Sequence, residues 1–228
     1  MNLNDTTLVH TQTYIDGQWV GADSGKAFDV VNPADGAIVG SVPDLGVTET
    51  RRAIDAANRA LPEWRALTAK KRASVLKKWH ALLMENVEDI ARIMSLEMGK
   101  PIRESRGEAV FGANFVEWFA EEGKRAYGEI IPTHDVSKRL LVVQQPIGVV
   151  GAITPWNFPL AMITRKVAPA LAAGCTVVVK PAEDSPLTAL AAAELAERAG
   201  LPAGVLINIT PSDPEPVGQE ISTNPIVR

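Results

Sequence analysis

Short runs of β-forming residues, separated by turn pairs, open the chain. Tyr14–Val20 places such residues on both sides of Asp16-Gly17, a pair typical of two-residue hairpin turns. Phe28–Val31 is a second short run, and it stops at Asn32-Pro33. The pattern therefore predicts small hairpins at the N-terminal end of the chain.

A helical period then replaces the strand pattern. Apolar residues three and four apart predict helices from Thr48 to Pro62, from Thr68 to Glu85, from Glu88 to Met98 and from Arg103 to Tyr127. Thr48 is the expected N-cap of the first helix, and Pro62 is its expected end. In the last helix, four aromatic side chains share one face, which favours core packing, with one wall of a substrate tunnel as the alternative. They are Phe111, Phe115, Trp118 and Phe119.

Strands alternate with helices in the second half of the chain. The strand patterns are Ile147–Ile153, Cys175–Lys180 and Val205–Ile209, and such continuous apolar runs are typical of strands buried on both faces. The helices between them are Leu160–Ala173 and a segment from the Ser185 N-cap to Ala199. The order β-α-β-α-β predicts an α/β fold with a parallel sheet and crossover helices.

The chain ends on the beginning of another strand pattern. Ile226–Arg228 follows the turn pair Asn224-Pro225. A sheet that stops at this point has an unpaired edge. We therefore infer that the chain is a fragment, or that a partner completes it.

Composition adds limits on function. The chain has 228 residues, of which 46% are hydrophobic and 22% charged, with a net charge of −4, which is ordinary globular usage. We expect no nucleic-acid partner without a basic excess, and no metal site from three scattered histidines and one cysteine. With no signal peptide and no apolar run of ~18 residues, we expect a cytoplasmic protein without a membrane partner.

Two polar clusters follow neighbouring strands. Thr154–Pro159 comes directly after Ile153, and Lys180–Glu183 ends the next strand. Ligands of open α/β sheets bind beyond the carboxyl ends of the strands, so both clusters are expected at one edge. The usual glycine-rich dinucleotide fingerprint is absent after all three strands, which argues against an ordinary nucleotide fold.

Residue types alone leave plainer roles open. Asn157 can be a turn or cap residue, and Lys180 a solvated charge. Arg165, on a helix, can be a surface ion-pair partner. Trp156 can serve packing as well as ligand contact.

Three motifs closely resemble the aldehyde dehydrogenase superfamily: Pro155–Pro159 (PWNFP), Leu171–Cys175 (LAAGC) and Lys180–Glu183 (KPAE). Glu117–Arg125 and Met162–Lys166 look like the succinate-semialdehyde dehydrogenase branch. The resemblance covers essentially the whole chain. Family members are roughly twice as long, so the chain matches their N-terminal half.

The resemblance implies a Rossmann-like NAD(P)-binding domain, incomplete over residues 1–228, without the catalytic domain. It implies that Asn157 donates its amide to the oxyanion formed when a thiolate adds to an aldehyde. It also implies that Arg165 pairs with a carboxylate on the substrate. The implied cofactor-binding residues are Ile153, Thr154, Pro155, Trp156, Lys180, Pro181, Ala182 and Glu183.

The implied cofactor is NAD or NADP. Glu183 accepts from the ribose hydroxyls and repels a 2′-phosphate, which slightly favours NAD, while Lys180 favours NADP. The resemblance also implies a homo-oligomer, with residues 138–145 as part of an oligomerisation arm, or completion by the missing C-terminal half.

The function implied by the resemblance is oxidation of succinate semialdehyde to succinate. The nucleophilic cysteine and the general-base glutamate lie in the missing half of the family pattern. Cys175 begins an apolar strand and is expected to be structural, so the chain alone should be inactive. A dehydrogenase for another small semialdehyde, or a non-catalytic nucleotide-binding module, are the alternatives.

Overall fold

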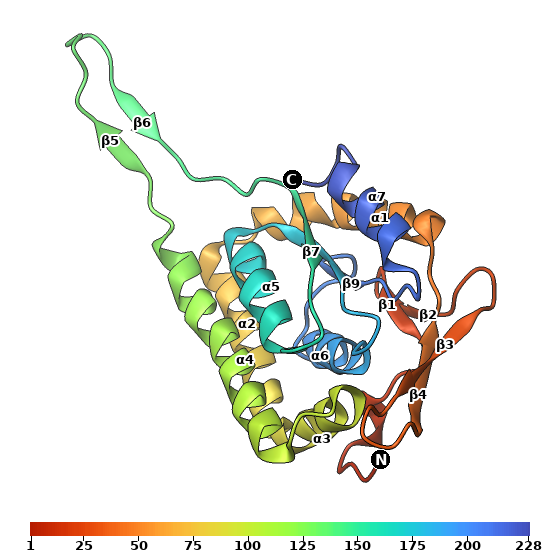
Figure 1. The fold of residues 1–228 in the computed structure, drawn as a ribbon. Coiled ribbons are helices and arrows are strands. Elements are labelled where there is room, and N and C mark those ends of the chain that lie inside the picture. Colours follow the sequence, from red (N-terminus) through yellow and green to blue (C-terminus); the bar gives the residue numbers. More distant parts are fainter.

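Three parallel strands form the centre of the molecule in the computed structural model, which describes residues 1–228 (Figure 1). They are β7 (Val149–Ile153), β8 (Thr176–Lys180) and β9 (Leu206–Asn208), in the order β7-β8-β9. The crossovers contain α5 (Ala161–Ala173) and α6 (Leu187–Arg198). The predicted α/β fold with a parallel sheet is confirmed.

Helices cover both faces of this sheet. Val177 and Val179 of β8 pack in the larger core cluster with α5 and α6. Val178 points the other way and packs in a second cluster with α1 (Val47–Ala66) and α7 (Pro214–Thr223). Because successive side chains of a strand alternate between faces, β8 is buried over its whole length.

β7 lies beside the last residues of the chain. Val149 forms a parallel bridge with Val227, and the Arg228 amide donates to the Val149 carbonyl at 2.9 Å. The expected strand start at the C-terminal end is therefore confirmed. Burial of β7 on both faces was a wrong expectation at its carboxyl end, because Ile153 emerges from the sheet and is 44% exposed.

The first helices follow the predicted pattern with two corrections at their ends. α1 has Gly46 as N-cap, not Thr48, and it continues past Pro62 to Ala66. A proline removes one main-chain hydrogen-bond donor and usually interrupts a helix. Here the turn after Pro62 is held in place by buried Trp64, whose Nε1 donates to the Leu171 carbonyl at 3.1 Å. α2 (Ala69–Glu85) and α3 (Val87–Met98) were predicted within a residue of their observed bounds.

α4 (Ile102–Glu122) ends earlier than predicted, in a short 3₁₀ turn, η2 (Gly123–Arg125). The expectation that its aromatic stripe packs in the core is wrong for Phe111 and Trp118, which are 52% and 62% exposed. Phe115 and Phe119 are half-buried, and Phe119 packs against the core. Small residues face the core instead: Ser105, Ala109, Gly112, Ala113, Val116 and Ala120. A Cβ on Gly112 would lie 2.9 Å from Leu160 Cγ, so the close approach of α4 to α5 requires this small face.

Two hairpins precede the helices, as predicted. The first pairs β1 (Thr13–Ile15) with β2 (Gln18–Val20), and the second pairs β3 (Ala27–Val31) with β4 (Ile38–Pro43). Before them lies a 3₁₀ turn, η1 (Thr6–Leu8).

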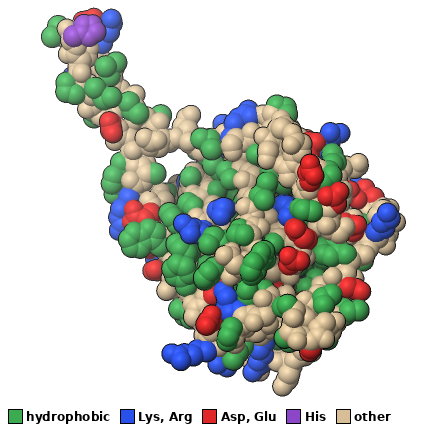
Figure 2. Space-filling view, in the orientation of Figure 1, with side chains coloured by type: hydrophobic (Ala, Val, Ile, Leu, Met, Phe, Trp, Pro, Cys, Tyr) green, Lys and Arg blue, Asp and Glu red, His purple; other side chains and the backbone are tan.

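A third hairpin extends away from the body of the molecule (Figure 1). It pairs β5 (Glu129–Ile131) with β6 (Leu140–Val142) antiparallel. Its apolar side chains are exposed, and Figure 2 shows hydrophobic groups along it. Residues 138–145 belong to this hairpin and its return, and their part in oligomerisation stays a prediction.

None of the helices combines the length and the apolar character that crossing a membrane requires.

Gly99 ends α3 with a φ of +79°, and a Cβ there would lie 2.7 Å from Pro33 Cγ. We expect Gly99→Ala to lower the free energy of unfolding by about 1–2 kcal/mol, because both the left-handed backbone and the contact oppose a side chain. Gly107→Ala, inside α4 with open space around it, should raise it by about 0.5–1 kcal/mol. Urea unfolding of both variants measures the difference, and equal stabilities would contradict the strain at Gly99.

Candidate functional site

The two polar loops predicted to meet do lie at the same edge of the sheet. Ile153 pairs with Lys180 in the parallel register of β7 and β8. Directly after this pair, the Thr154 amide donates to the Lys180 carbonyl at 3.1 Å. Farther along, the Ser185 hydroxyl donates to the Trp156 carbonyl at 3.5 Å. The expectation that both clusters share one edge is confirmed.

A lysine–glutamate pair occupies the second loop. Lys180 Nζ lies 2.9 Å from Glu183 Oε2 and donates to the Pro181 carbonyl at 3.1 Å. The lysine side chain is 5% exposed and the glutamate side chain 36%, so the alternative of a solvated lysine is wrong. Burial raises the pKa of Glu183, but hydrogen bonds from Lys180 and the main chain, together with the lysine charge, outweigh it and leave the pKa lowered. Glu183 is therefore ionised at neutral pH.

The first loop presents a mixed surface. Ile153, Pro155, Trp156 and Asn157 are exposed, whereas Thr154 is buried and its hydroxyl has no protein hydrogen-bond partner.

Beside this loop lies a cavity of about 420 Å³, lined by Trp156, Glu183 and Asp184 together with residues of β3 and α3. Pro181 and Ala182 are buried behind the rim. The lining of this open cleft mixes apolar side chains with the carboxyl groups of Asp29, Glu97, Glu183 and Asp184.

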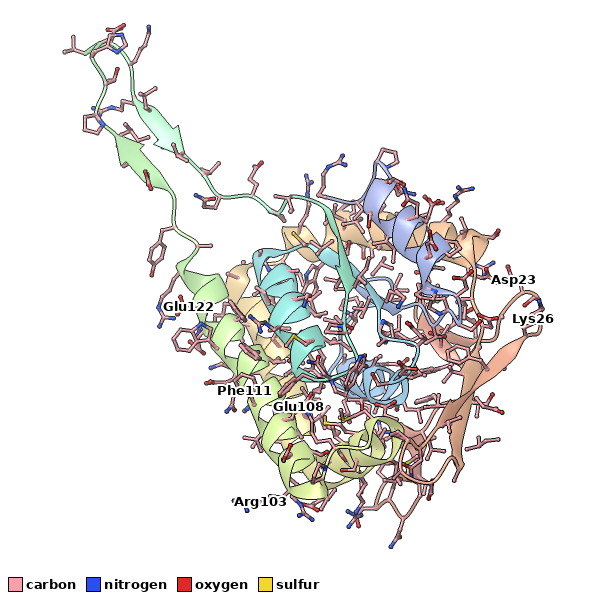
Figure 3. All side chains as sticks on the ribbon, in the orientation of Figure 1. Asp23, Lys26, Arg103, Glu108, Phe111 and Glu122 are labelled. Atoms are coloured by element: carbon pink, nitrogen blue, oxygen red, sulfur yellow. The ribbon has the colours of Figure 1, made fainter.

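Lys100 and Glu108 fix the first loop from outside the sheet, and sequence reasoning assigned neither a role. Lys100 forms an ion pair with Glu108 and donates to the Asn157 carbonyl at 2.9 Å. Glu108, labelled on α4 in Figure 3, accepts from the Leu160 and Ala161 amides at 3.0 and 3.2 Å.

Glu97 holds the start of α6 in the same way. Its carboxylate accepts from the Leu187 and Thr188 amides at 2.7 and 2.9 Å. Ser185 is therefore not the N-cap that the sequence suggested: α6 begins after Pro186, and Glu97 satisfies its free amides. Burial raises the pKa of Glu97 to about 7, with Glu108 adding to the rise, although the hydrogen bonds it accepts oppose it.

Arg165 lies apart from the lysine–glutamate pair, on the side of α5 that faces α4. It is exposed, and its guanidinium carbon lies 5.7 Å from the centroid of the Phe115 ring. Arg165 therefore makes a cation–π contact with Phe115 and no ion pair with a carboxylate. The aromatic residues of α4 line a cavity of about 260 Å³ there, and Figure 2 shows hydrophobic groups gathered over this helix.

Cys175 is buried just before the amino end of β8. The two loops lie at the carboxyl end of the same strand. The structure therefore keeps this thiol away from the candidate site, in agreement with the structural role expected for it.

Comparison with known families and structures decides what this arrangement belongs to. The model of the aldehyde dehydrogenase family matches residues 19–228. The chain belongs to the aldehyde dehydrogenase family. The resemblance drawn from the sequence motifs is confirmed.

Curated relatives of this aldehyde dehydrogenase chain include two bacterial enzymes. The succinate-semialdehyde dehydrogenase [NADP(+)] GabD of Escherichia coli is 60% identical over 228 residues, and the glutarate-semialdehyde dehydrogenase of Pseudomonas aeruginosa is 59% identical. In both cases the match covers 100% of this chain and 47% of the relative. The chain therefore spans about half the length of the curated relatives it matches.

Solved structures agree with the fold. A crystal structure described as an E. coli NADP dependent enzyme is 60% identical with a TM-score of 0.98. A succinate-semialdehyde dehydrogenase from Burkholderia pseudomallei is 54% identical, also with a TM-score of 0.98. Each match covers 100% of this chain and 47% of the solved chain. The fold is that of the aldehyde dehydrogenases, truncated.

The raised pKa of Glu97 predicts a pH-dependent stability. Below the ordinary carboxyl value of 4.5 both folded and unfolded chains hold the proton. As the pH rises toward 7 the unfolded chain releases it first, so stability falls, by at most ~1.4 kcal/mol per pH unit. We expect Glu97→Gln to remove this slope in urea unfolding between pH 4.5 and 7.

Glu88→Gln is the matched control, because Glu88 lies on the same helix but at the surface, paired with Arg106. Because the Arg106 hydrogen bond lowers the pKa of Glu88, this carboxyl is ionised in folded and unfolded chains as the pH approaches 7, so the control should leave the fall in stability toward pH 7 unchanged. Identical slopes for Glu97→Gln and the unchanged chain would contradict the assignment.

Proposed function

We propose that the chain supplies the cofactor-binding and oxyanion-binding part of an NAD(P)-dependent dehydrogenase that oxidises succinate semialdehyde to succinate. The observation that carries the proposal is the common edge of β7 and β8, where Asn157 and the Lys180–Glu183 pair lie on adjoining loops. The E. coli relative at 60% identity bears the name of this activity.

The residues at this edge fit a nicotinamide dinucleotide. The Thr154 hydroxyl is a buried group free to bond a ligand, and the ionised Glu183 carboxylate can accept from both hydroxyls of a ribose. Ile153, Pro155 and Trp156 offer apolar surface beside them. When bound, the nicotinamide supplies the hydride acceptor.

The lysine–glutamate pair bears on the choice between NAD and NADP. An ionised Glu183 repels a 2′-phosphate, whereas Lys180 attracts it and also neutralises part of the repulsion. We infer that both dinucleotides bind, with a modest preference for NAD. The E. coli relative is named for NADP(+), so cofactor choice is a point on which the two proteins can differ.

We assign to Asn157 the role of stabilising the oxyanion. A neutral amide fixed in place stabilises the charge that develops on an aldehyde oxygen when a thiolate adds to the carbonyl carbon. The thiolate is not Cys175, which is buried at the other end of β8. The nucleophile and the general base must then come from the portion that the longer relatives have, and the chain by itself should not oxidise aldehydes.

We assign to Arg165 the role of binding the carboxylate of the substrate. Its exposed guanidinium lies beside the aromatic surface of α4, which can line the path of a short aliphatic aldehyde. A planar guanidinium binds a carboxylate through two parallel hydrogen bonds. The exposure of Phe111 and Trp118 thus favours the tunnel wall over the core for these two residues.

A second small semialdehyde is a specific alternative, because the P. aeruginosa relative is 59% identical and is named for glutarate semialdehyde. A nucleotide-binding module without catalysis is the other alternative. The protruding β5–β6 hairpin, with its exposed apolar side chains, supports assembly into a homo-oligomer through residues 138–145.

Cofactor binding can be tested on the chain itself by calorimetric titration with NAD and NADP. We expect both to bind, and Glu183→Gln to shift the ratio of the two dissociation constants about tenfold toward NADP, because a like-charge repulsion is removed. Asp184→Asn, at an exposed position on the same cavity, should shift it far less. Failure of both dinucleotides to bind would contradict the proposed site.

Substrate choice can be tested by fusing the chain to the C-terminal half of the E. coli relative. The fusion should oxidise succinate semialdehyde, and the chain alone should not. Arg165→Ala should raise KM for succinate semialdehyde ~10–100-fold, the value of a charged hydrogen-bonded pair, and leave KM for butanal nearly unchanged.

Arg103→Ala is the control for the fusion, because Arg103 is an exposed arginine on α4 (Figure 3). An Arg165→Ala variant that keeps its preference for the acidic aldehyde would contradict the role of Arg165. Comparison of succinate with glutarate semialdehyde separates the two candidate substrates.

A further inference from the structure

The loop that carries Asn157 depends on few contacts for its position. It connects β7 to α5, and Ile153, Pro155, Trp156 and Asn157 along it are exposed. At its start the Thr154 amide is tied to the sheet. In the middle of the loop the Trp156 carbonyl accepts a long hydrogen bond of 3.5 Å from the Ser185 hydroxyl. The contacts at Asn157 and beyond therefore fix the main chain that carries the Asn157 amide.

Lys100 makes those contacts on the Asn157–Phe158 segment. Its ammonium donates to the Asn157 carbonyl at 2.9 Å and lies 3.9 Å from the centroid of the Phe158 ring. The same ammonium is paired with Glu108. The Lys100 ammonium therefore contacts the Asn157 main chain, the Phe158 ring and the Glu108 carboxylate of α4 at the same time.

Glu108 connects these contacts to the start of α5. Its Oε1 accepts from the Leu160 and Ala161 amides at 3.0 and 3.2 Å, and its Oε2 faces Lys100. A negative charge at a helix N-terminus is favourable, and amides there have no other partner within the helix. The carboxylate thus joins both ends of the segment 157–161 to one point on α4.

Burial gives this arrangement its strength. The side chains of Lys100 and Glu108 are only 9% and 1% exposed, so little water screens their attraction. Gly112, one turn along α4 from Glu108, leaves room for Leu160 to press against the helix. The segment is therefore held by charge on one side and by close packing on the other.

We propose that Lys100 and Glu108 are positioning residues that aim the Asn157 amide at the aldehyde oxygen. The inference rests on the proposed function, in which Asn157 stabilises the oxyanion. Neither residue touches the substrate; both act through the main chain of residues 157–161. Because displacement of a catalytic group by about 1 Å can cost ~100-fold in rate, loss of the pair should appear in kcat.

The test uses two paired variants. Lys100→Met/Glu108→Gln removes both charges together, so that no unpaired charge stays buried, and glutamine can still cap α5. Lys77→Met/Glu121→Gln is the matched control, because it removes another lysine–glutamate ion pair that joins α2 to α4 near the surface.

The first measurement is hydrogen exchange on the chain of 228 residues, which needs no activity. The amides of Phe158 and of residues 160–163 should exchange at least tenfold faster in Lys100→Met/Glu108→Gln, with the sheet unchanged. The control variant should exchange there as the unchanged chain does. Unaltered exchange of this segment in the first variant overturns the inference.

The second measurement is kinetics in the fusion with the C-terminal half of the E. coli relative. Lys100→Met/Glu108→Gln should lower kcat about 10–100-fold and change KM for the dinucleotide less than about threefold. Added to Asn157→Ala, the paired change should lower kcat by no more than about a further twofold, because the group it positions is gone.

The outcomes separate the two proposals. An equal loss of kcat with and without Asn157 means that the pair supports the fold only, and overturns the positioning role. A full kcat in Asn157→Ala overturns the oxyanion role of Asn157 and with it the catalytic purpose of the pair. If the Lys100→Met/Glu108→Gln variant nevertheless shows faster exchange at Phe158 and residues 160–163, the contacts of Lys100 and Glu108 hold the loop as described. The proposed function is then the part that has failed.

Discussion

Two buried carboxylates at helix N-termini hold the crossover helices of the sheet. Glu97 of α3 binds the first amides of α6, and Glu108 of α4 binds those of α5. The free amides at a helix start need acceptors, and the helix dipole favours a negative charge there. Helices α3 and α4, which precede the sheet in the sequence, are thereby joined to the crossover helices of that sheet. The loops of the site lie between these two parts of the molecule.

Each loop of the site is fixed at two ends by different forces. At the strand end, the parallel register that pairs Ile153 with Lys180 sets where both loops begin. At the helix end, a carboxylate from the preceding helices sets where each loop finishes. The residues between these ends, exposed Asn157 and half-buried Glu183 among them, can face a ligand while the main chain beneath them stays in place, which is the preorganisation that binding and catalysis require.

Charge is used differently at the two carboxylates. Glu108 has a lysine beside it, which offsets the cost of burial, and the same lysine reaches the site loop. Glu97 has no cation beside it, and burial, with a smaller contribution from the charge of Glu108, raises its pKa to about 7. The start of α6 is therefore the part of this framework that responds to protonation near neutral pH, whereas the start of α5 is held by a compensated pair.

The sequence by itself determined the two N-terminal hairpins, the order of strands and helices in the parallel sheet, the family and the meeting of the two loops at one edge, because strand alternation and parallel topology follow from local patterns. Only the tertiary structure decided that Lys180 is buried and that Phe111 and Trp118 of α4 face outward. It also decided that Glu97 and Glu108 cap helices about ninety and fifty residues away. A periodic pattern shows which side chains share a helix face, but which face is covered depends on the elements that pack against it. The choice on α4 was set by its close approach to α5, which only small residues permit.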